Sequence, residues 1–226
     1  MTREPKATQP VPELTPDQYQ AAVARLEAEL REYQPCNGQE RADRKLMLHY
    51  LGLGADCFDR TSLAHFTCSA WTVDPTRTET LMVYHNIYDS WSWIGGHADG
   101  DPRLAQVAAR ELQEETGIAH ASLVPCGIYS LETLTVDGHE KHGAYVSSHL
   151  HLNVTYLFVA DPALPLRSAP AENRAVSWVK LTDVVPLSSE PWIRERIYRK
   201  LIERLDTVPA DCWQAALTDC ARNSRR

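Results

Sequence analysis

The sequence predicts one α/β domain with a helical extension in front of it, and three observations support this prediction. A glycine turn at 95–96 runs directly into an amphipathic helix that ends at Gly117. β-rich runs precede and follow that helix, at 64–88 and 149–160. A second amphipathic helix follows at 190–205. With 226 residues, 43% of them hydrophobic, the chain can bury a substantial core, and a single domain is the simplest division.

The N-terminal part predicts a tail followed by a helical hairpin. Residues 1–13 are polar and punctuated by proline, so they cannot bury enough apolar surface to fold alone, and we expect disorder there. Thr15 precedes a helix that Pro35 ends, and Asn37 precedes a second helix. This extension, 14–60, is expected either to cover one edge of the domain or to form a dimer contact. The sequence leaves a homodimer open.

The next elements lead to the glycine turn. Two β-rich runs in 64–88 flank the polar segment PTRTE and predict a hairpin. Trp91 and Trp93 are expected to pack beneath the turn as part of the core. In the helix that follows, Asp101 is expected to cap the N-terminus and Pro102 to occupy the first turn, where a missing N–H costs nothing.

Acidic residues share a face of this helix with apolar ones. At about 100° per residue, Glu111 and Glu115 fall in the apolar sector, and Glu114 lies on its flank. Buried carboxylates are costly unless a cation neutralises them, and three converging oxygen donors suit Mg²⁺ or Mn²⁺. Arg110 is expected to pair with Glu114 four residues later. A solvated acidic surface helix would show a similar run of charges. The apolar residues of the sector are Leu104, Val107, Ala108 and Leu112.

Beyond this helix, the sequence predicts an interrupted strand, a connection and a strong strand. Pro125 interrupts the strand expected within 121–136, and DGHEKHGAYVSS predicts a turn-rich connection. Alternation in 149–160 predicts one polar and one apolar face, and the polar face predicts a wet pocket, although an exposed edge strand would look the same. The polar face holds His149, His151, Asn153 and Thr155.

The C-terminal part predicts a strand and two helices. The strand AVSWVKL is followed by Ser189, which is expected to cap the closing helix at 190–205, and a short helix is expected within 207–226. The apolar stripe of the closing helix is Trp192, Ile193, Ile197, Leu201, Ile202 and Leu205.

Composition narrows the partners. A formal net charge of −7 argues against general binding to nucleic acid or to an anionic membrane surface. No run approaches the roughly 18 apolar residues of a membrane-spanning helix. The six cysteines form no CxxC pair and no secretory signal precedes them, so we expect reduced thiols and a cytoplasmic location.

A known motif accounts for the acidic helix. The chain fits G-x5-E-x7-R-E-U-x-E-E-x-G-U, where U is aliphatic, and over roughly 62–206 it resembles the Nudix hydrolase superfamily. Pro102 departs from the pattern, because it stands where the family has its first glutamate, and the adjacent Asp101 is a candidate replacement. The matching residues are Gly96, Arg110, Glu111, Glu114, Glu115, Gly117 and Ile118.

The resemblance implies an α/β/α sandwich with a mixed sheet and a Mg²⁺-dependent or Mn²⁺-dependent pyrophosphohydrolase. Water would attack phosphorus in a small-molecule diphosphate of the nucleoside diphosphate-X type. The implied metal ligands are Glu111, Glu114, Glu115 and the Gly96 carbonyl, and the implied catalytic residues are Glu111, Glu114 and Arg110 with Glu172 from a loop outside the motif. Glu132 and Glu140 are the rivals of Glu172.

Histidines and an arginine are the candidates for substrate contact. His97, His149 and His151 are expected to line the substrate pocket, with metal ligation as the second interpretation, and activity is then expected to depend on pH near the free histidine value of about 6.5. Arg60 is a candidate by its placement, and a surface salt bridge is the simpler interpretation. Further candidates by placement are His65 and Arg167.

Two other functions on the same fold remain open. A non-catalytic ligand sensor is expected to have lost the metal carboxylates, which this sequence retains. An isoprenoid diphosphate isomerase needs histidine ligands and a reactive cysteine beside the motif, and the nearest cysteines are Cys68 and Cys126. Metal-dependent phosphate release would separate hydrolysis from both alternatives.

Overall fold

The computed structural model describes residues 14–53, 56–86, 89–141, 143–171 and 173–224, so the tail expected at 1–13 lies outside the described residues. Its helices are α1 (Pro16–Glu32), α2 (Gly38–Gly52), α3 (Leu104–Thr116), α4 (Leu181–Leu187), α5 (Arg199–Arg204) and α6 (Ala210–Asn223), with a π-helical segment at Ile193–Tyr198 and a 3-10 turn at Leu205–Thr207. Its strands are β1 (Ala64–Val73), β2 (Glu79–His85), β3 (Ser90–Ser92), β4 (Ile94–His97), β5 (Ser122–Leu123), β6 (Ser130–Val136), β7 (His139–Lys141), β8 (Ala144–Val146), β9 (His149–Val159) and β10 (Asn173–Lys180).

A mixed sheet forms the centre of the fold. β1 and β9 run parallel, in register from Ala64 and Leu150 to Val73 and Val159. The other pairings are antiparallel: β2 and β4 on β1, β5 and β6 on β9, and β3 and β10 on β2. The hairpin predicted in 64–88 is β1 and β2, and they pair at Val73 and Thr80, beyond the segment of β1 that β4 occupies.

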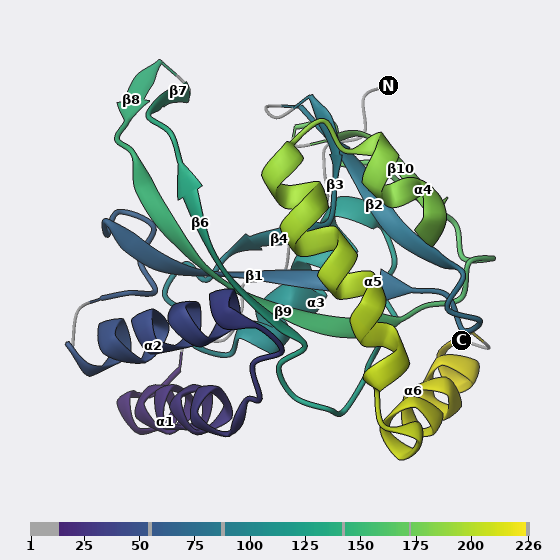
Figure 1. Cartoon of the computed structure of the whole chain (residues 1–226), viewed down its shortest axis with the longest axis horizontal. Helices are drawn as coiled ribbons and strands as arrows, with labels where there is room; N and C mark the ends of the chain where they lie inside the picture. The colour runs from purple at the N-terminus through teal and green to yellow at the C-terminus, as the bar shows by residue number, and fades with distance from the viewer. Residues whose placement is uncertain (1–13, 54–55, 87–88, 142, 172, 225–226) are drawn as a thin grey trace.

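Helices cover both faces of this sheet, which confirms the α/β/α sandwich (Figure 1). On one face, Phe66 and Cys68 of β1 pack in a core that includes Val107 and Leu112 of α3. On the other face, apolar residues from β1, β2 and β9 pack with α4, α5 and α6. Burial of apolar area on both faces is what holds such layers together.

The predicted N-terminal hairpin is present as α1 and α2, which lie together beside the sheet in Figure 1. Thr15 and Gln18 form a reciprocal capping box at the start of α1, and the Asn37 side chain accepts a hydrogen bond from the Glu40 N–H at the start of α2. Leu30 and Met47 are fully buried in the same core as α3. The two helices therefore cover one edge of the domain, as one of the two interpretations expected.

A buried ion cluster connects α2, β6 and α5. Lys200 Nζ lies 3.1 Å from Glu40 Oε1 and 2.9 Å from Glu132 Oε1, and it also donates to the Leu131 carbonyl at 3.2 Å. The lysine and both glutamates are buried. No local sequence pattern predicts this cluster, because its members are far apart in the chain.

Several boundaries differ from the expectation. The connection at 137–148 contains the β7–β8 hairpin, which projects from the sheet (Figure 1). The closing helix starts after Ser189, which was predicted as its cap. The Glu190 carbonyl accepts the hydrogen bond from the Arg194 N–H, and the Ser189 N–H donates to Ser90 Oγ in β3. Trp192 is 57% exposed and is not part of the apolar stripe. α4 was not predicted, because Pro186 lies within it.

The remaining predictions concern thiols and membranes. All six cysteines lie among the described residues and are free thiols: Cys36, Cys57, Cys68, Cys126, Cys212 and Cys220. Among the helices of the described segments, none has the length and apolar character needed to cross a membrane.

Candidate active site

Gly95 and Gly96 do not form the predicted turn. They lie within strand β4, opposite Ser69 and Cys68 of β1, and they let α3 approach this strand. A Cβ added to Gly96 would lie 2.3 Å from Glu111 Cδ, so only a glycine lets the Glu111 carboxylate approach this backbone. A Cβ at Gly95 would lie 2.5 Å from the Cys68 carbonyl oxygen in the neighbouring strand. The two glycines thus allow β4 to lie close to both β1 and α3.

Glu115 connects α3 to the same strand. Its side chain is only 3% exposed, and its Oε1 accepts a hydrogen bond from the Gly95 N–H at 3.2 Å. The Glu115 backbone carbonyl accepts from Asn173 Nδ2, also at 3.2 Å, and Asn173 is the first residue of β10. The start of β10 is therefore held against the C-terminal end of the acidic helix.

The three carboxylates differ in exposure. Glu115 is buried, Glu111 is half-buried against Gly96, and Glu114 is exposed on the flank, as the helical spacing predicts. This gives an all-oxygen donor set beside the backbone of β4, and hard oxygen donors are those that Mg²⁺ and Mn²⁺ prefer. The residues present therefore fit such an ion. Arg110 and Glu114 are both described, and they do not form the expected ion pair within 4 Å.

Asp101 does not cap α3. The helix starts at Leu104 with Arg103 at its N-cap, and the Asp101 carboxylate accepts from the Arg103 backbone N–H at 2.9 Å and from its guanidinium at 2.8 Å. Burial raises the pKa of the Asp101 carboxyl, but the hydrogen bonds from Arg103 outweigh it, and its pKa is lowered. This carboxylate already binds Arg103, so it is a poor replacement for the glutamate that Pro102 displaces.

Arg60 pairs with Asp99, which lies in the loop after β4. Its Nε donates to Asp99 Oδ1 at 2.6 Å, and its Nη2 donates to the second carboxylate oxygen. Burial raises the pKa of Asp99, but the hydrogen bonds and charge of Arg60 outweigh it, and its pKa is lowered. Both side chains are about half exposed, which matches the surface ion pair of the simpler interpretation. Arg167 is exposed and caps the end of α3, where its N–H donates to the Thr116 carbonyl.

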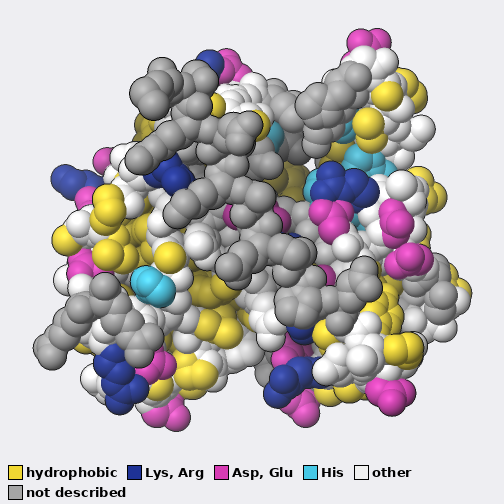
Figure 2. Space-filling model, turned by 180° about the vertical axis from the view of Figure 1, so that it is seen from behind, with side chains coloured by type: hydrophobic (Ala, Val, Ile, Leu, Met, Phe, Trp, Pro, Cys, Tyr) yellow, Lys and Arg dark blue, Asp and Glu magenta, His cyan; other side chains and the backbone are white. Residues whose placement is uncertain are grey.

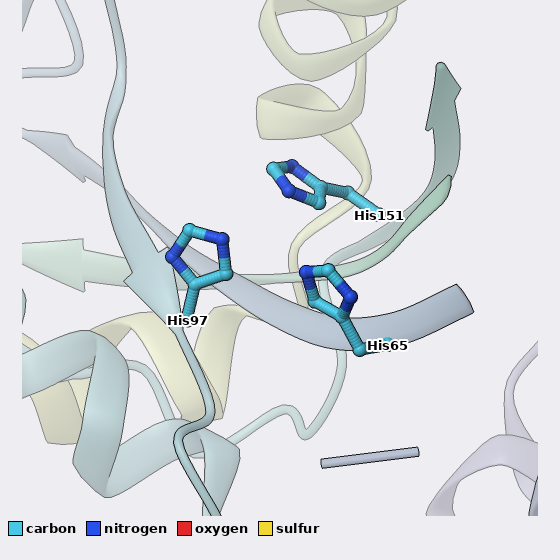
Figure 3. A group of neighbouring side chains, drawn as sticks. All are labelled: His65, His97 and His151. Atoms are coloured by element: carbon cyan, nitrogen blue, oxygen red, sulfur yellow. The ribbon is translucent and has the colours of Figure 1, made fainter. Parts of the chain in front are cut away.

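Four histidines gather at one end of the central strands. His65 and His151 are register partners on β1 and β9, and His97 of β4 is the partner of Thr67 on β1. Figure 3 shows the rings of His65, His97 and His151 turned toward one another, with ring centroids 4.9 to 5.2 Å apart. His149 Nε2 lies 3.1 Å from His151 Nε2. The structure thus brings the three predicted histidines together and adds His65 at their centre.

Burial changes the acidity of these rings. Burial is the main cause that lowers the pKa of His65, and burial together with the charges of the neighbouring histidines lowers the pKa of His151 to about 2. These two rings are therefore neutral at physiological pH, and they do not supply the predicted titration near the free histidine value of about 6.5.

The inner half of the polar face of β9 is a buried hydrogen-bond network. Glu132 Oε2 accepts from Asn153 Nδ2 and from Thr155 Oγ1, both at 3.0 Å, and Ser69 Oγ donates to Asn153 Oδ1 at 2.9 Å. These side chains are almost completely buried. The predicted wet pocket is therefore wrong for this half of the face, and Glu132 is held by Lys200 and by this network.

The remaining candidates have the following positions. Glu172 lies outside the described residues, and Glu140 is part of the projecting strand β7. Trp93 packs edge-on against Tyr198, with ring centroids 5.6 Å apart, so it belongs to the core as expected. Figure 2 shows the back of the molecule, where histidine side chains gather next to basic and acidic ones at the base of the projecting arm.

The family model of the NUDIX domain matches residues 65–201 of the 226 residues, which is more than half of the chain. The chain belongs to the Nudix family. Among curated proteins, the comparison found no match. The Nudix match includes β4, α3 and the four clustered histidines His65, His97, His149 and His151.

Solved structures similar to this Nudix chain have low sequence identity. An Ap4A hydrolase from C. elegans in a binary complex is 18% identical and covers 63% of this chain and 98% of its own, with a TM-score of 0.47. The E. coli dihydroneopterin triphosphate pyrophosphohydrolase is 14% identical, with coverages of 65% and 98% and a TM-score of 0.49. The NUDIX domain of Shewanella oneidensis NrtR, complexed with ADP ribose, is 21% identical, with coverages of 62% and 87% and a TM-score of 0.42.

Proposed function

We propose that this Nudix protein hydrolyses a diphosphate linkage in a small molecule of the nucleoside diphosphate-X type. The observation that carries the proposal is the approach of the Glu111 carboxylate to Gly96, beside a buried Glu115 that binds the Gly95 N–H. Glu111, Glu114, Glu115 and the Gly96 carbonyl are the residues that would hold Mg²⁺ or Mn²⁺.

The residues of the chain divide the work of this reaction. A divalent ion, when bound, neutralises diphosphate oxygens and lowers the pKa of water, which are the two obstacles to attack on phosphorus. Glu115 fixes the distance between α3 and β4 through the hydrogen bond that it accepts from the Gly95 N–H. Glu111, which is half-buried beside Gly96, is proposed to orient the attacking water and accept its proton.

Substrate contacts are proposed for the residues around Gly96. His97 follows Gly96 directly, His151 lies next to His97, and His149 lies next to His151, so a phosphate or the X moiety can reach all three. Arg60 can contribute only if a substrate competes with Asp99 for its guanidinium. Arg110 lies on the same helix as the carboxylates and is proposed to position them.

The alternatives are less well supported. An isomerase would find histidines here, but Cys68 is completely buried, with its Sγ 3.9 Å from the Gly96 carbonyl oxygen. Burial raises the pKa of the Cys68 thiol well above its ordinary value, which disfavours the thiolate. A ligand sensor does not require the carboxylates that α3 retains.

A substrate panel tests the proposed function. Purified protein is incubated with nucleoside diphosphate sugars, dinucleoside polyphosphates and nucleoside triphosphates, with Mg²⁺, with Mn²⁺ and with a chelator, and the products are separated by chromatography. We expect metal-dependent cleavage of at least one diphosphate. Binding of a nucleotide without turnover would instead support the sensor.

Glu172 is proposed to complete the metal site from the loop before β10. Its described neighbour Asn173 binds the Glu115 carbonyl, so this end of β10 lies at α3. We expect Glu172→Gln to lower turnover more than Glu140→Gln, which serves as the exposed control. A third variant, Glu132→Gln, tests the other rival. Because this change disturbs a buried network, turnover is compared per folded molecule. Unchanged turnover in Glu172→Gln would eliminate this residue.

A further inference from the structure

We propose that His65, His97 and His151 bind a divalent transition-metal ion of the Zn²⁺ class, with His149 beside them as a further donor. One ligand nitrogen from each of the three histidines lies within 4.8 Å of the other two. The rings come from β1, β4 and β9 and point toward one volume (Figure 3). This site uses none of the carboxylates on α3, but it assigns metal binding to histidines that the proposed function assigns to substrate contact.

The strand register separates this site from the acidic helix. Side chains alternate along a strand, so Gly96 and His97 face opposite sides of β4. Gly96 pairs with Cys68, which packs in the α3 core, and it lies against Glu111. His97 pairs with Thr67, whose side chain lies on the other face with His65. The two donor sets therefore occupy different sides of the same strand.

His65 is prepared for a ligand. It is fully buried, and its Nδ1 donates to the Ser62 carbonyl oxygen at 2.8 Å, which leaves the lone pair on Nε2. Within the described part of the chain, this buried Nε2 has no hydrogen-bond partner. A buried polar atom without a hydrogen-bond partner destabilises the fold, and coordination of an ion would remove that cost. A metal-ligating histidine commonly donates its second N–H to a backbone carbonyl in this way.

The His149 and His151 pair has the spacing of two ligands. His149 Nδ1 lies 2.8 Å from the Ser147 carbonyl oxygen, so its Nε2 also carries a lone pair. That Nε2 is 3.1 Å from His151 Nε2. Two nitrogens bound at about 2.0–2.1 Å to one tetrahedral ion are about 3.3 Å apart. The nitrogens of this pair therefore need little movement to bind one ion.

The donor type selects the metal. Neutral imidazoles suit Zn²⁺, Co²⁺ and Ni²⁺, whereas Mg²⁺ requires hard oxygen donors. When His65, His97 and His151 are bound, the fourth position of a tetrahedral ion is available to His149 or to an oxygen ligand. The site should therefore retain Zn²⁺ or Co²⁺ in the presence of excess Mg²⁺.

Metal binding without substrate tests the proposal. The full chain, stripped with a chelator, is titrated with Co²⁺ in excess Mg²⁺, the visible absorption bands of low-symmetry Co²⁺ are recorded, and bound Zn²⁺ is measured by elemental analysis after dialysis. We expect one equivalent of either ion in the wild type. His97→Asn and His151→Asn should each weaken binding by more than the roughly 10–100-fold loss that removing an outer-shell partner causes.

Two controls make the outcome specific. His120→Asn changes an exposed histidine outside the cluster and should bind Co²⁺ like the wild type. The double variant Glu111→Gln with Glu115→Gln should also keep the Co²⁺ bands, because its substitutions lie on the opposite side of β4. Absence of Co²⁺ and Zn²⁺ binding by the wild type, or equal binding by folded His97→Asn and His151→Asn, would overturn the proposal. So would loss of the bands in the double variant alone.

Discussion

Glu115→Gln is expected to abolish turnover while the protein stays folded. The amide retains an oxygen that can accept the Gly95 N–H, so the contact between α3 and β4 survives. The negative charge that would hold the metal is lost, and several kcal/mol of charge stabilisation correspond to a fall in turnover of about 10³-fold or more. Steady-state kinetics and titration calorimetry with Mg²⁺ or Mn²⁺ measure the two effects.

Gln113→Glu is the matched control for this variant. Gln113 is exposed on the same helix, so the change tests whether charge on α3 matters in general. We expect near wild-type kinetics from it. Unchanged metal affinity in Glu115→Gln, at the same far-UV circular dichroism, would show that this glutamate is not a ligand.

Lys200→Met is expected to lower the free energy of unfolding strongly. The substitution leaves Glu40 and Glu132 buried without the charge that lies 3.1 and 2.9 Å from them. Breaking a buried ion pair by removing one partner costs about 3–5 kcal/mol. For a chain of this size, that corresponds to a fall in Tm of about 6–20 °C.

The pH dependence of this loss identifies its cause. Burial raises the pKa of Glu40, but the charge of Lys200 and the Cys36 N–H outweigh it and bring the pKa to about 2, below the ordinary 4.5. A lowered folded-state pKa contributes stability above the ordinary pKa, and that contribution is lost as the pH falls from 4.5 toward 2. Urea unfolding of both proteins at about pH 7 and about pH 3 should therefore show a smaller difference in acid.

Arg199→Met provides the comparison for Lys200→Met. Arg199 precedes Lys200 on the same helix, and its partner Glu195 is also exposed. Exposed pairs contribute about 0–1 kcal/mol, so we expect little change. Equal unfolding free energies in the Lys200→Met and wild-type proteins would mean that the cluster adds no net stability.

Elements with a strong local period were predictable from sequence. The apolar sector of α3 and the alternation of β9 determined both elements and the faces that carry Glu115 and His151. The capping box of α1 is also a local signal. Such patterns depend on residues within one or two turns, so a single sequence contains them.

Features that depend on distant pairings were not predictable. The parallel register that places His65 opposite His151 joins strands more than 80 residues apart, and no local pattern specifies it. The same holds for Lys200 with Glu40 and Glu132. Asp101 was predicted as a cap because its residue type favours caps, but the helix starts three residues later and Arg103 takes its carboxylate.

The most direct test of the proposed function is hydrolysis of the best panel substrate in ¹⁸O-labelled water, with mass spectrometry of both products. We expect one phosphate-bearing product to contain ¹⁸O from water when Mg²⁺ or Mn²⁺ is present. We also expect Glu115→Gln to give neither product. Metal-independent cleavage, or ¹⁸O only on carbon in the X moiety, would contradict attack of water on phosphorus at the carboxylates of α3.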